Sequence, residues 1–161
     1  MKADKVYQLL NDLSIPYEII EHKAALTVEE MEQVLPEMDA QVCKNLFLRD
    51  QKGKQHYLVV MGKEKPFNLK KFEASQGLDK MSFASEKRLL KYLDVPSGSV
   101  SPFGLINDTA AHVIVYVDTA LKKCEKVGVH PNVNNAIVTF DSSNLEKYFK
   151  SLDHDVYWVK M

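Results

Sequence analysis

The sequence predicts an α+β protein, because segments with helical and strand patterns follow one another without a regular repeat. Five segments have the apolar spacing or the capping residues of helices, and about seven short apolar or aromatic runs have the boundaries of strands. No strand–helix–strand unit recurs along the chain, and no internal repeat is visible. These observations favour α+β over a fold built from repeated βαβ units.

The N-terminal quarter contains two predicted helices and one strand. Apolar residues at helical spacing predict a helix near 3–13, which ends at Pro16 before a strand at 17–20. Thr27-Val28-Glu29-Glu30 is a capping box, in which the threonine hydroxyl accepts the N–H three residues on and the last glutamate reaches back. The helix that it opens runs to about residue 35, with Val28 and Met31 on one face.

The middle third reads as a hairpin followed by two short helices. Strands at 43–50 and 56–61 are joined by a turn that contains Gly53. A helix at 68–75 stops at Gly77, and a short strand at 81–83 precedes a helix at 86–93 capped by Ser85.

The C-terminal third contains four predicted strands and one helix. His112–Asp118 has aliphatic side chains on both faces, which is typical of a strand in the middle of a sheet. Strands at 126–129 and 136–140 follow, then a helix that Asp141 or Ser142 caps, and a last strand at 155–159.

The composition is that of a globular protein with one domain. The chain has 161 residues, of which 45% are hydrophobic, and no apolar run approaches the ~20 residues of a membrane span. The N-terminus lacks the uninterrupted apolar core of a signal peptide. Cys43 and Cys124 lie far apart without a CxxC partner, so reduced thiols in a cytosolic protein are expected.

The net charge of −1 conceals a basic middle third. Residues 1–43 hold 3 Lys or Arg and 9 Asp or Glu, residues 44–91 hold 12 and 5, and residues 92–161 hold 6 and 8, which gives net charges of −6, +7 and −2. A local basic face can follow a phosphate backbone even on a nearly neutral molecule. Solvent-exposed lysines on helices and turns, without any role in binding, would give the same count.

The segment Gly98–Asp108 (G-S-V-S-P-F-G-L-I-N-D) has the composition of a ligand-binding loop. Its small residues leave amide N–H groups free to point at a ligand, and it contains no long charged side chain. Its apolar residues, among them Val100 and Phe103, predict that it is half buried, unlike a solvated linker. An ordinary connecting loop with a packed anchor would explain the same residues.

Lys44 and His130 are the candidate chemical groups outside this loop. Strand alternation places Lys44 on the same face as Leu46 and Leu48, so its ammonium must either reach solvent or meet an anion such as a phosphate or a developing oxyanion. His130 ends a strand just before Pro131, which keeps it extended, and nearby Asn side chains could bind ligand hydroxyls. A strand-end lysine and a turn-capping histidine are the plain alternatives.

Missing motifs exclude several enzyme classes. The other histidines lack the spacing of metal ligands, and the chain has no GxSxG elbow, Walker sequence or dinucleotide fingerprint. Neither a metal nor a cofactor is therefore expected. Cys43, beside a predicted sheet core, is expected to be an inert packing residue.

Five sequence blocks occur in order: E-H-K-A-A-L-T-V-E-E-M (Glu21–Met31), K-N-L-F-L-R-D (Lys44–Asp50), M-S-F-A-S-E (Met81–Glu86), the segment Gly98–Asp108, and V-H-P-N-V-N (Val129–Asn134). Together they resemble the YbaK/ProX family of free-standing aminoacyl-tRNA deacylases, relatives of the editing domain of bacterial prolyl-tRNA synthetases. The resemblance runs from about Glu21 to His154. It implies one editing domain over residues 1–161, with a curved, mixed, mostly antiparallel sheet flanked by helices.

The resemblance implies hydrolysis, in the cytoplasm, of the ester between an amino acid and the terminal ribose of tRNA. Lys44 matches the family's essential lysine, Asn45 would hold the terminal nucleotide, and His130 matches the family's histidine near the aminoacyl end. The catalytic G-x-x-x-P loop corresponds to Gly98, Ser99, Val100, Ser101 and Pro102. Further substrate contacts are expected from Phe103, Gly104 and Asn134.

The expected chemistry needs no protein nucleophile. Attack of water on the ester builds negative charge that amides in the loop would stabilise, and a ribose hydroxyl would orient the water. Because one methylene is worth only about 1–3 kcal/mol in binding, a second pocket too small for proline would discriminate by size. We expect Val28 and Met31 to wall this pocket opposite Lys44, although plain core packing would also explain them.

The K-N-L-F-L block favours the ProX branch, which resembles enzymes that remove alanine from proline tRNA. Lys23 and Leu26 stand where the family more often has Pro and Phe, so a deacylase for cysteine or serine remains an alternative. A non-catalytic module that binds aminoacyl-tRNA or a synthetase is a second alternative. The expected partner is tRNA, and prolyl-tRNA synthetase is a further expected one.

Overall fold

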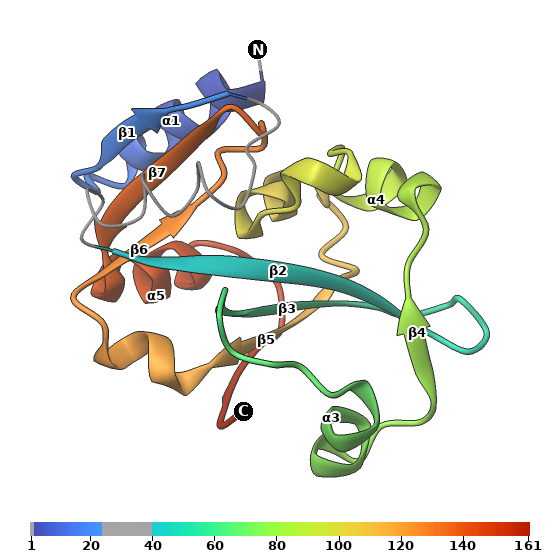
Figure 1. Ribbon diagram of the computed structural model, residues 1–161. Coiled ribbons are helices and arrows are strands. Elements are labelled where there is room, and N and C mark those ends of the chain that lie inside the picture. Colours follow the sequence, from blue (N-terminus) through green and yellow to red (C-terminus); the bar gives the residue numbers. More distant parts are fainter. Residues whose placement is uncertain (1, 24–39) are drawn as a thin grey trace.

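The computed structural model describes residues 2–23 and 40–161, which contain an eight-stranded sheet with helices around it (Figure 1). The strand order is β1-β7-β6-β2-β3-β5-β8, and β4 pairs with β2 outside this path. The strands are β1 (Glu18–Glu21), β2 (Gln41–Asp50), β3 (His56–Gly62), β4 (Met81–Phe83), β5 (Ile114–Asp118), β6 (Lys126–Val129), β7 (Ala136–Asp141) and β8 (Val156–Val159). The predicted strands are all present, and the α+β class is confirmed.

The sheet is mixed rather than mostly antiparallel, which corrects that part of the expectation. Pairs β1–β7, β6–β7, β2–β3 and β2–β4 are antiparallel, whereas β2–β6, β3–β5 and β5–β8 are parallel. The pairs β3–β5 and β5–β8 are parallel because the chain leaves β3 and β5 through long connections that contain helices and then returns in the same direction. β5 lies between β3 and β8, as its aliphatic residues on both faces predicted.

Four α-helices lie in the described residues: α1 (Lys2–Asp12), α3 (Leu69–Gln76), α4 (Glu86–Tyr92) and α5 (Ser142–Lys150). Their predicted boundaries are confirmed, since Ser85 and Asp141 accept backbone N–H groups at the starts of α4 and α5. Gly77 ends α3 in a left-handed conformation with φ of +64°. The predicted helix at 27–35 lies outside the described residues. In the part of the chain that the structure describes, the helices are too short or too polar to cross a membrane.

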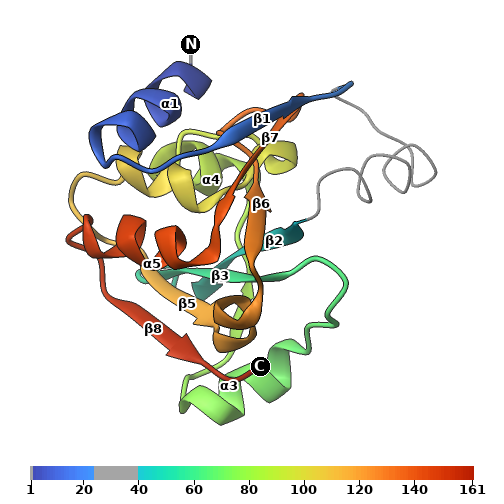
Figure 2. The ribbon, with the colours of Figure 1, turned by 90° about the vertical axis from the view of Figure 1, so that its left-hand side faces the viewer.

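The alternate residues of β2 face two apolar clusters. Cys43 and Phe47 belong to the larger cluster, which also includes side chains of α1, α4 and α5. Leu48 belongs to a smaller cluster that includes Phe72 of α3. Figure 2 shows α1, α4 and α5 gathered on one side of the strands, with α3 apart from them. β2 therefore separates two differently covered faces.

The segment expected to be a half-buried loop folds into two short 3-10 helices, η1 (Ser97–Ser99) and η2 (Pro102–Asn107). Ser101 and Phe103 are fully buried, whereas Val100 is half-buried, so the expectation is confirmed. A Cβ on Gly104 would lie 2.9 Å from the Leu93 Cβ, so η2 packs against the end of α4 more closely than any larger residue allows.

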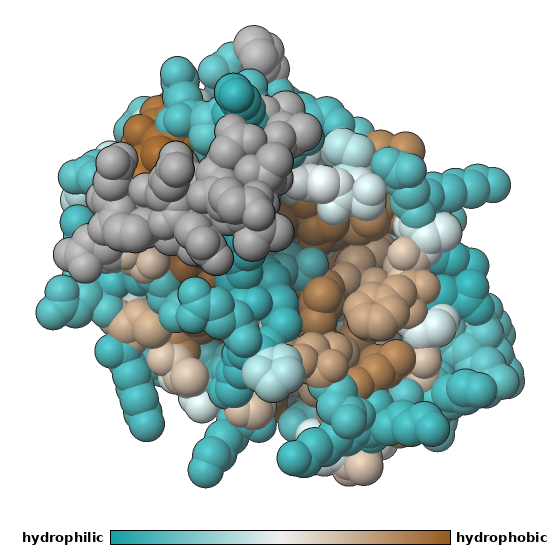
Figure 3. Space-filling model, in the orientation of Figure 1, coloured by the Kyte–Doolittle hydropathy of each residue, from teal (hydrophilic) through white to brown (hydrophobic). Residues whose placement is uncertain are grey.

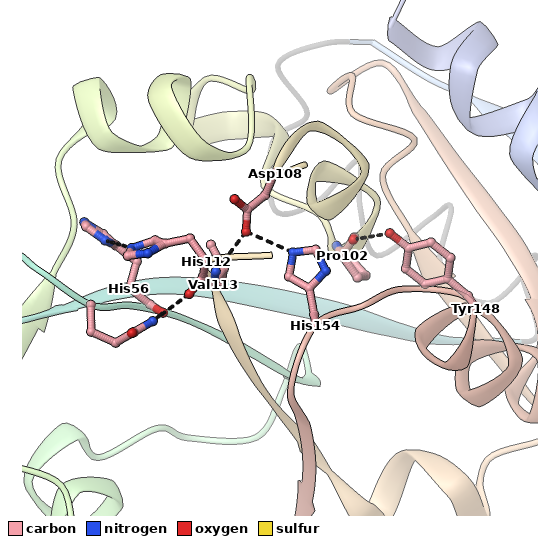
Figure 4. A network of polar contacts seen from close by, with 8 residues as sticks. His56, Pro102, Asp108, His112, Val113, Tyr148 and His154 are labelled. Carbon is pink, nitrogen blue, oxygen red and sulfur yellow. Dashed lines mark hydrogen bonds and ion pairs between the residues drawn. The ribbon is translucent and has the colours of Figure 1, made fainter. Parts of the chain in front are cut away.

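A buried histidine connects α4 to the β2–β3 hairpin. Arg88 Nη1 donates to His56 Nε2 (2.9 Å) and to the Gly53 carbonyl (3.0 Å). Since arginine can only donate, His56 is neutral and carries its proton on Nδ1, which lies 3.0 Å from His112 Nε2. Figure 4 shows the two histidines side by side. Burial first, and then the neighbouring His112 and Arg88, lower the pKa of His56 from 6.5 to about 4.

We expect this histidine to make the free energy of unfolding fall as the pH drops from 6.5 to about 4. In that range the unfolded chain binds a proton at this position and the folded chain does not, so acid favours unfolding. Urea denaturation at about pH 7 and about pH 4.5 measures the loss. His56→Gln should lose a part of the pH dependence, and a variant as sensitive to pH as the wild type would contradict the assignment.

Candidate active site

The predicted ligand loop, Gly98–Pro102, lies against the turn between β6 and β7. A Cβ on Gly98 would lie 3.7 Å from Asn134 Nδ2. Just beyond the loop, the Phe103 carbonyl accepts a hydrogen bond from Asn132 Nδ2 (3.3 Å). The structure therefore brings together two sequence blocks that were expected to share a site.

Two buried polar contacts hold the loop from outside. Tyr148 of α5 is fully buried and donates its hydroxyl to the Pro102 carbonyl (2.7 Å), as Figure 4 shows. Its ring packs edge-on against the Phe103 ring, with 4.9 Å between the centroids. Burial raises the pKa of Tyr148 well above its ordinary value, so the hydroxyl keeps the proton that it donates. After η2, Asp108 accepts a hydrogen bond from His154 Nε2 (2.9 Å).

Only some amides of the loop are free to meet a ligand. Ser99 N–H donates to the Pro96 carbonyl (3.0 Å), and Phe103 N–H donates to Ser101 Oγ (3.1 Å). Pro102 has no N–H. The N–H groups of Val100 and Ser101 have no hydrogen-bond partner among the described residues. Ser101 is fully buried, where an N–H without a partner is rare and costly, and Val100 precedes it, so these two amides are the candidate donors for a ligand oxygen.

His130 is held as a neutral acceptor at the start of the turn that contacts this loop. Its Nδ1 lies 3.0 Å from the Ala136 carbonyl, which can only accept, so Nδ1 carries the proton and Nε2 keeps its lone pair. Burial lowers the pKa of His130 and outweighs the opposite effect of this hydrogen bond. The nearby His22 and Lys63 lower the pKa further. His130 is therefore uncharged at neutral pH.

A second histidine, which sequence reasoning did not select, packs against His130. The His22 ring lies at 62° to the His130 ring, with 6.2 Å between the centroids. Its Nδ1 contacts the Lys23 carbonyl (2.6 Å), and its buried Nε2 has no hydrogen-bond partner among the described residues. In the described ranges, 2–23 and 40–161, no group of three or more His, Cys, Asp or Glu side chains could hold a metal ion.

Asn45 projects from β2 toward the large apolar cluster that contains Phe103. It shares the face of Phe47 by strand alternation, and its buried Oδ1 has no partner within residues 2–23 and 40–161. Within residues 2–23 and 40–161 one edge of β2 is unpaired here, since β6 pairs only with Gln41 and Val42 and β4 pairs only with 48–50. An unpaired buried amide at an open strand edge is suited to bind a ligand.

Lys44 projects from the other face of β2, together with Leu46 and Leu48 as predicted. Its ammonium donates to the Lys65 carbonyl, and the Lys65 ammonium forms an ion pair with the buried Asp118 (2.7 Å). A hollow of about 320 Å³ lies beside this pair. Among the described residues no contact joins Lys44 to the loop, so their cooperation stays a prediction.

Four further residues were predicted to contact the substrate: Val28, Met31, Phe103 and Gly104. Val28 and Met31 lie outside the described residues. Phe103 is fully buried and Gly104 packs against Leu93, so both are placed to shape the loop rather than to line an open surface.

Sequence reasoning also missed two residues that hold the loop, Asn132 and Tyr148. Asn132 is 2% exposed and has a left-handed backbone with φ of +63°, which Asn tolerates better than most residues. Its place after Pro131 in a turn was the available signal. Tyr148 lies within a helix, where nothing in the local sequence indicates a hydrogen bond to a distant loop.

The chain resembles known proteins over most of its length. Residues 22–148 match the model of the aminoacyl-tRNA editing domain family. The chain is 48% identical to the prolyl-tRNA editing protein ProX of Acetoanaerobium sticklandii, over 88% of this chain and 87% of that protein. It is 31% identical to prolyl-tRNA synthetase associated domain-containing protein 1 of Mus musculus, over 92% of this chain and 89% of that protein.

The fold is also found among solved structures. The crystal structure of hypothetical protein APE2540 superimposes with a TM-score of 0.73 at 22% identity, and the match covers 96% of this chain and 98% of that one. This likeness concerns the fold alone. The family match covers the loop, the β6–β7 turn and β2, and on that ground the chain belongs to the aminoacyl-tRNA editing domain family.

Proposed function

We propose that the protein is a trans-editing hydrolase that removes a wrongly attached amino acid from the 3′-terminal ribose of a tRNA, with alanine on proline tRNA as its main substrate. Its membership of the editing family and its 48% identity to a ProX protein support this activity. The structural observation that carries the proposal is the braced loop, whose Val100 and Ser101 amides have no partner in the described chain and lie on a segment that contacts the turn after His130.

The loop would stabilise charge as it develops. Attack of water on the ester carbonyl converts its oxygen into an oxyanion, and the N–H groups of Val100 and Ser101 are donors for that oxygen. Because Tyr148 and Asn132 fix the adjacent backbone, these donors need little reorganisation during the reaction. Removing one such donor typically costs about 2.7–4 kcal/mol of barrier. A neighbouring ribose hydroxyl orients the water, so the reaction needs neither a protein nucleophile nor a cofactor.

His130, Asn45 and Lys44 would position the substrate. The neutral His130 accepts a hydrogen bond at Nε2 from the aminoacyl end. Asn45 binds the terminal nucleotide through its unpaired amide, and Asn134 contributes beside Gly98. Lys44 exchanges its present carbonyl partner for a phosphate, which is a stronger partner for an ammonium.

Selectivity would come from size. A pocket walled by Val28 and Met31 admits alanine and rejects proline, which a synthetase built for proline cannot achieve by binding alone. We assign residues 1–161 to one editing domain that acts in the cytoplasm on tRNA and cooperates with prolyl-tRNA synthetase. The basic residues between 44 and 91 supply the affinity for RNA that depends on salt.

The direct test is deacylation of Ala-, Pro- and Cys-tRNA(Pro) by the purified protein. We expect Ala-tRNA(Pro) to be cleaved fastest and Lys44→Ala to lower kcat/KM by about 10- to 100-fold, because hydrogen bonds to charged groups contribute about 1.5–3 kcal/mol. Lys160→Ala, which removes an exposed lysine near the C-terminus, is the matched control. Failure to cleave any of the three substrates would favour a non-catalytic binding module, and preference for Cys-tRNA(Pro) would favour the alternative substrate.

Tyr148→Phe tests the role of the brace. The change leaves the buried Pro102 carbonyl without its donor, which costs about 1–3 kcal/mol of stability and frees the loop to move. We expect kcat for Ala-tRNA(Pro) to fall more than KM rises, since the loop acts on the transition state. Tyr157→Phe, which alters an exposed tyrosine, should change neither quantity. Reduced stability of Tyr148→Phe with unchanged kcat would limit Tyr148 to a structural role.

A further inference from the structure

Phe83 is an exposed aromatic residue on the edge strand β4. Its exposed fraction is 58%, the largest among the big apolar side chains of residues 2–23 and 40–161. Phe83 pairs with Leu48 of β2, so it lies on the face of the sheet that carries Leu46 and Lys44. This face is opposite to that of Asn45.

Phe83 is part of a wider apolar surface. Leu46 is half-buried and packs, like Phe67, against the cluster that contains Leu48 and Phe72. Figure 3 shows the surface as an apolar patch over β2 and β4, between α4 and α3, with hydrophilic residues around it. We name Leu46 and Phe83 the apolar platform. A contiguous patch of this kind marks a contact surface more often than a single exposed side chain does.

The platform lies in the basic part of the chain. Residues 44–91 contain 12 Lys or Arg against 5 Asp or Glu, and Lys44 stands two residues before Leu46 on the same face. A second copy of this chain would bring the same positive charge to the surface, which opposes self-association. Single-stranded nucleic acid fits both features, because its bases stack on aromatic side chains while its phosphates bind lysines.

We infer that the apolar platform stacks an unpaired base in the 3′ tail of the tRNA acceptor end, an inference that rests on the proposed function because it takes the RNA of that substrate as its ligand. Phe83 pairs with Leu48, which lies four positions after Lys44 on β2. At a rise of about 3.3 Å per residue, Lys44 and Leu48 are about 13 Å apart along the strand. This distance exceeds the length of one nucleotide. The stacked base therefore belongs to a different nucleotide from the one whose phosphate Lys44 binds.

The test measures, by fluorescence anisotropy, binding of a labelled RNA hairpin that has an unpaired 3′ tail and carries no amino acid. We expect Phe83→Ala to weaken binding by roughly 5- to 100-fold, the range for losing one base–aromatic stack. Phe83→Tyr keeps the ring and should bind like the wild type. The same hairpin without its tail should bind equally to all three proteins. Tyr157→Ala, which removes another exposed ring on β8, is the matched control and should leave binding unchanged.

Wild-type affinity of Phe83→Ala for the tailed hairpin would overturn the inference. An equal loss for both hairpins would also overturn it, since the effect would not then come from a base in the tail. A dimer of the wild type that dissociates in Phe83→Ala would make the platform a contact between copies. If circular dichroism shows Phe83→Ala to be unfolded, Phe83→Leu, which keeps an apolar side chain without a ring, replaces it.

The probe separates this inference from the proposed function, because it carries no ester. A protein that leaves Ala-, Pro- and Cys-tRNA(Pro) intact but binds the tail only when residue 83 has an aromatic ring would refute the deacylase and support the platform. A protein that cleaves Ala-tRNA(Pro) and binds the tail equally with or without an aromatic ring at residue 83 would support the deacylase and refute the platform.

Discussion

The hydrogen bond from the buried Tyr148 hydroxyl to the Pro102 carbonyl is the contact on which the proposed chemistry depends. A loop of Gly and Ser residues has few side chains with which to fix itself, and its backbone can adopt many conformations. Tyr148 fixes it from α5, and Asn132 fixes the adjacent Phe103 carbonyl from the β6–β7 turn. Amides held in this way can stabilise an oxyanion without first having to be ordered.

β2 gives the molecule its second constraint. Because side chains alternate along a strand, Asn45 and Lys44 project to opposite faces although they are neighbours in sequence. Asn45 faces the cluster that includes Phe103, whereas Lys44 lies on the face of Leu46. In our account the ester is cut on the first face, and the RNA crosses the open edge of β2 to reach the second. Lys44 is then close to the nucleic acid rather than to the amino acid.

The local features of the fold were predictable because their causes are local. Strand alternation and caps such as Ser85 act within a few residues, so the strands and the helix starts could be read from the sequence. The parallel pairs β3–β5 and β5–β8 depend on the path of long connections, which no short pattern encodes.

The candidate site, like the fold, has parts that could be predicted from the sequence and parts that could not. The loop and the turn with His130 were singled out from their residue types, and the structure brings the two segments into contact. The hydrogen bond of Tyr148 to a carbonyl 46 positions away could not be predicted, because any tyrosine in an apolar helix face would look the same. The position of His22 Nε2, which has no hydrogen-bond partner among the residues that the structure describes, likewise depends on packing between distant segments.

The central claim is that the Val100 and Ser101 amides receive the oxygen of the aminoacyl group. Titration with an alanyl-adenosine analogue in which an amide replaces the ester, followed by NMR of the backbone amides, tests it most directly. The account predicts that these two N–H resonances shift most and that the His130 side chain responds with them. Shifts confined to the hollow beside Lys65 and Asp118, with Val100 and Ser101 unchanged, would contradict it.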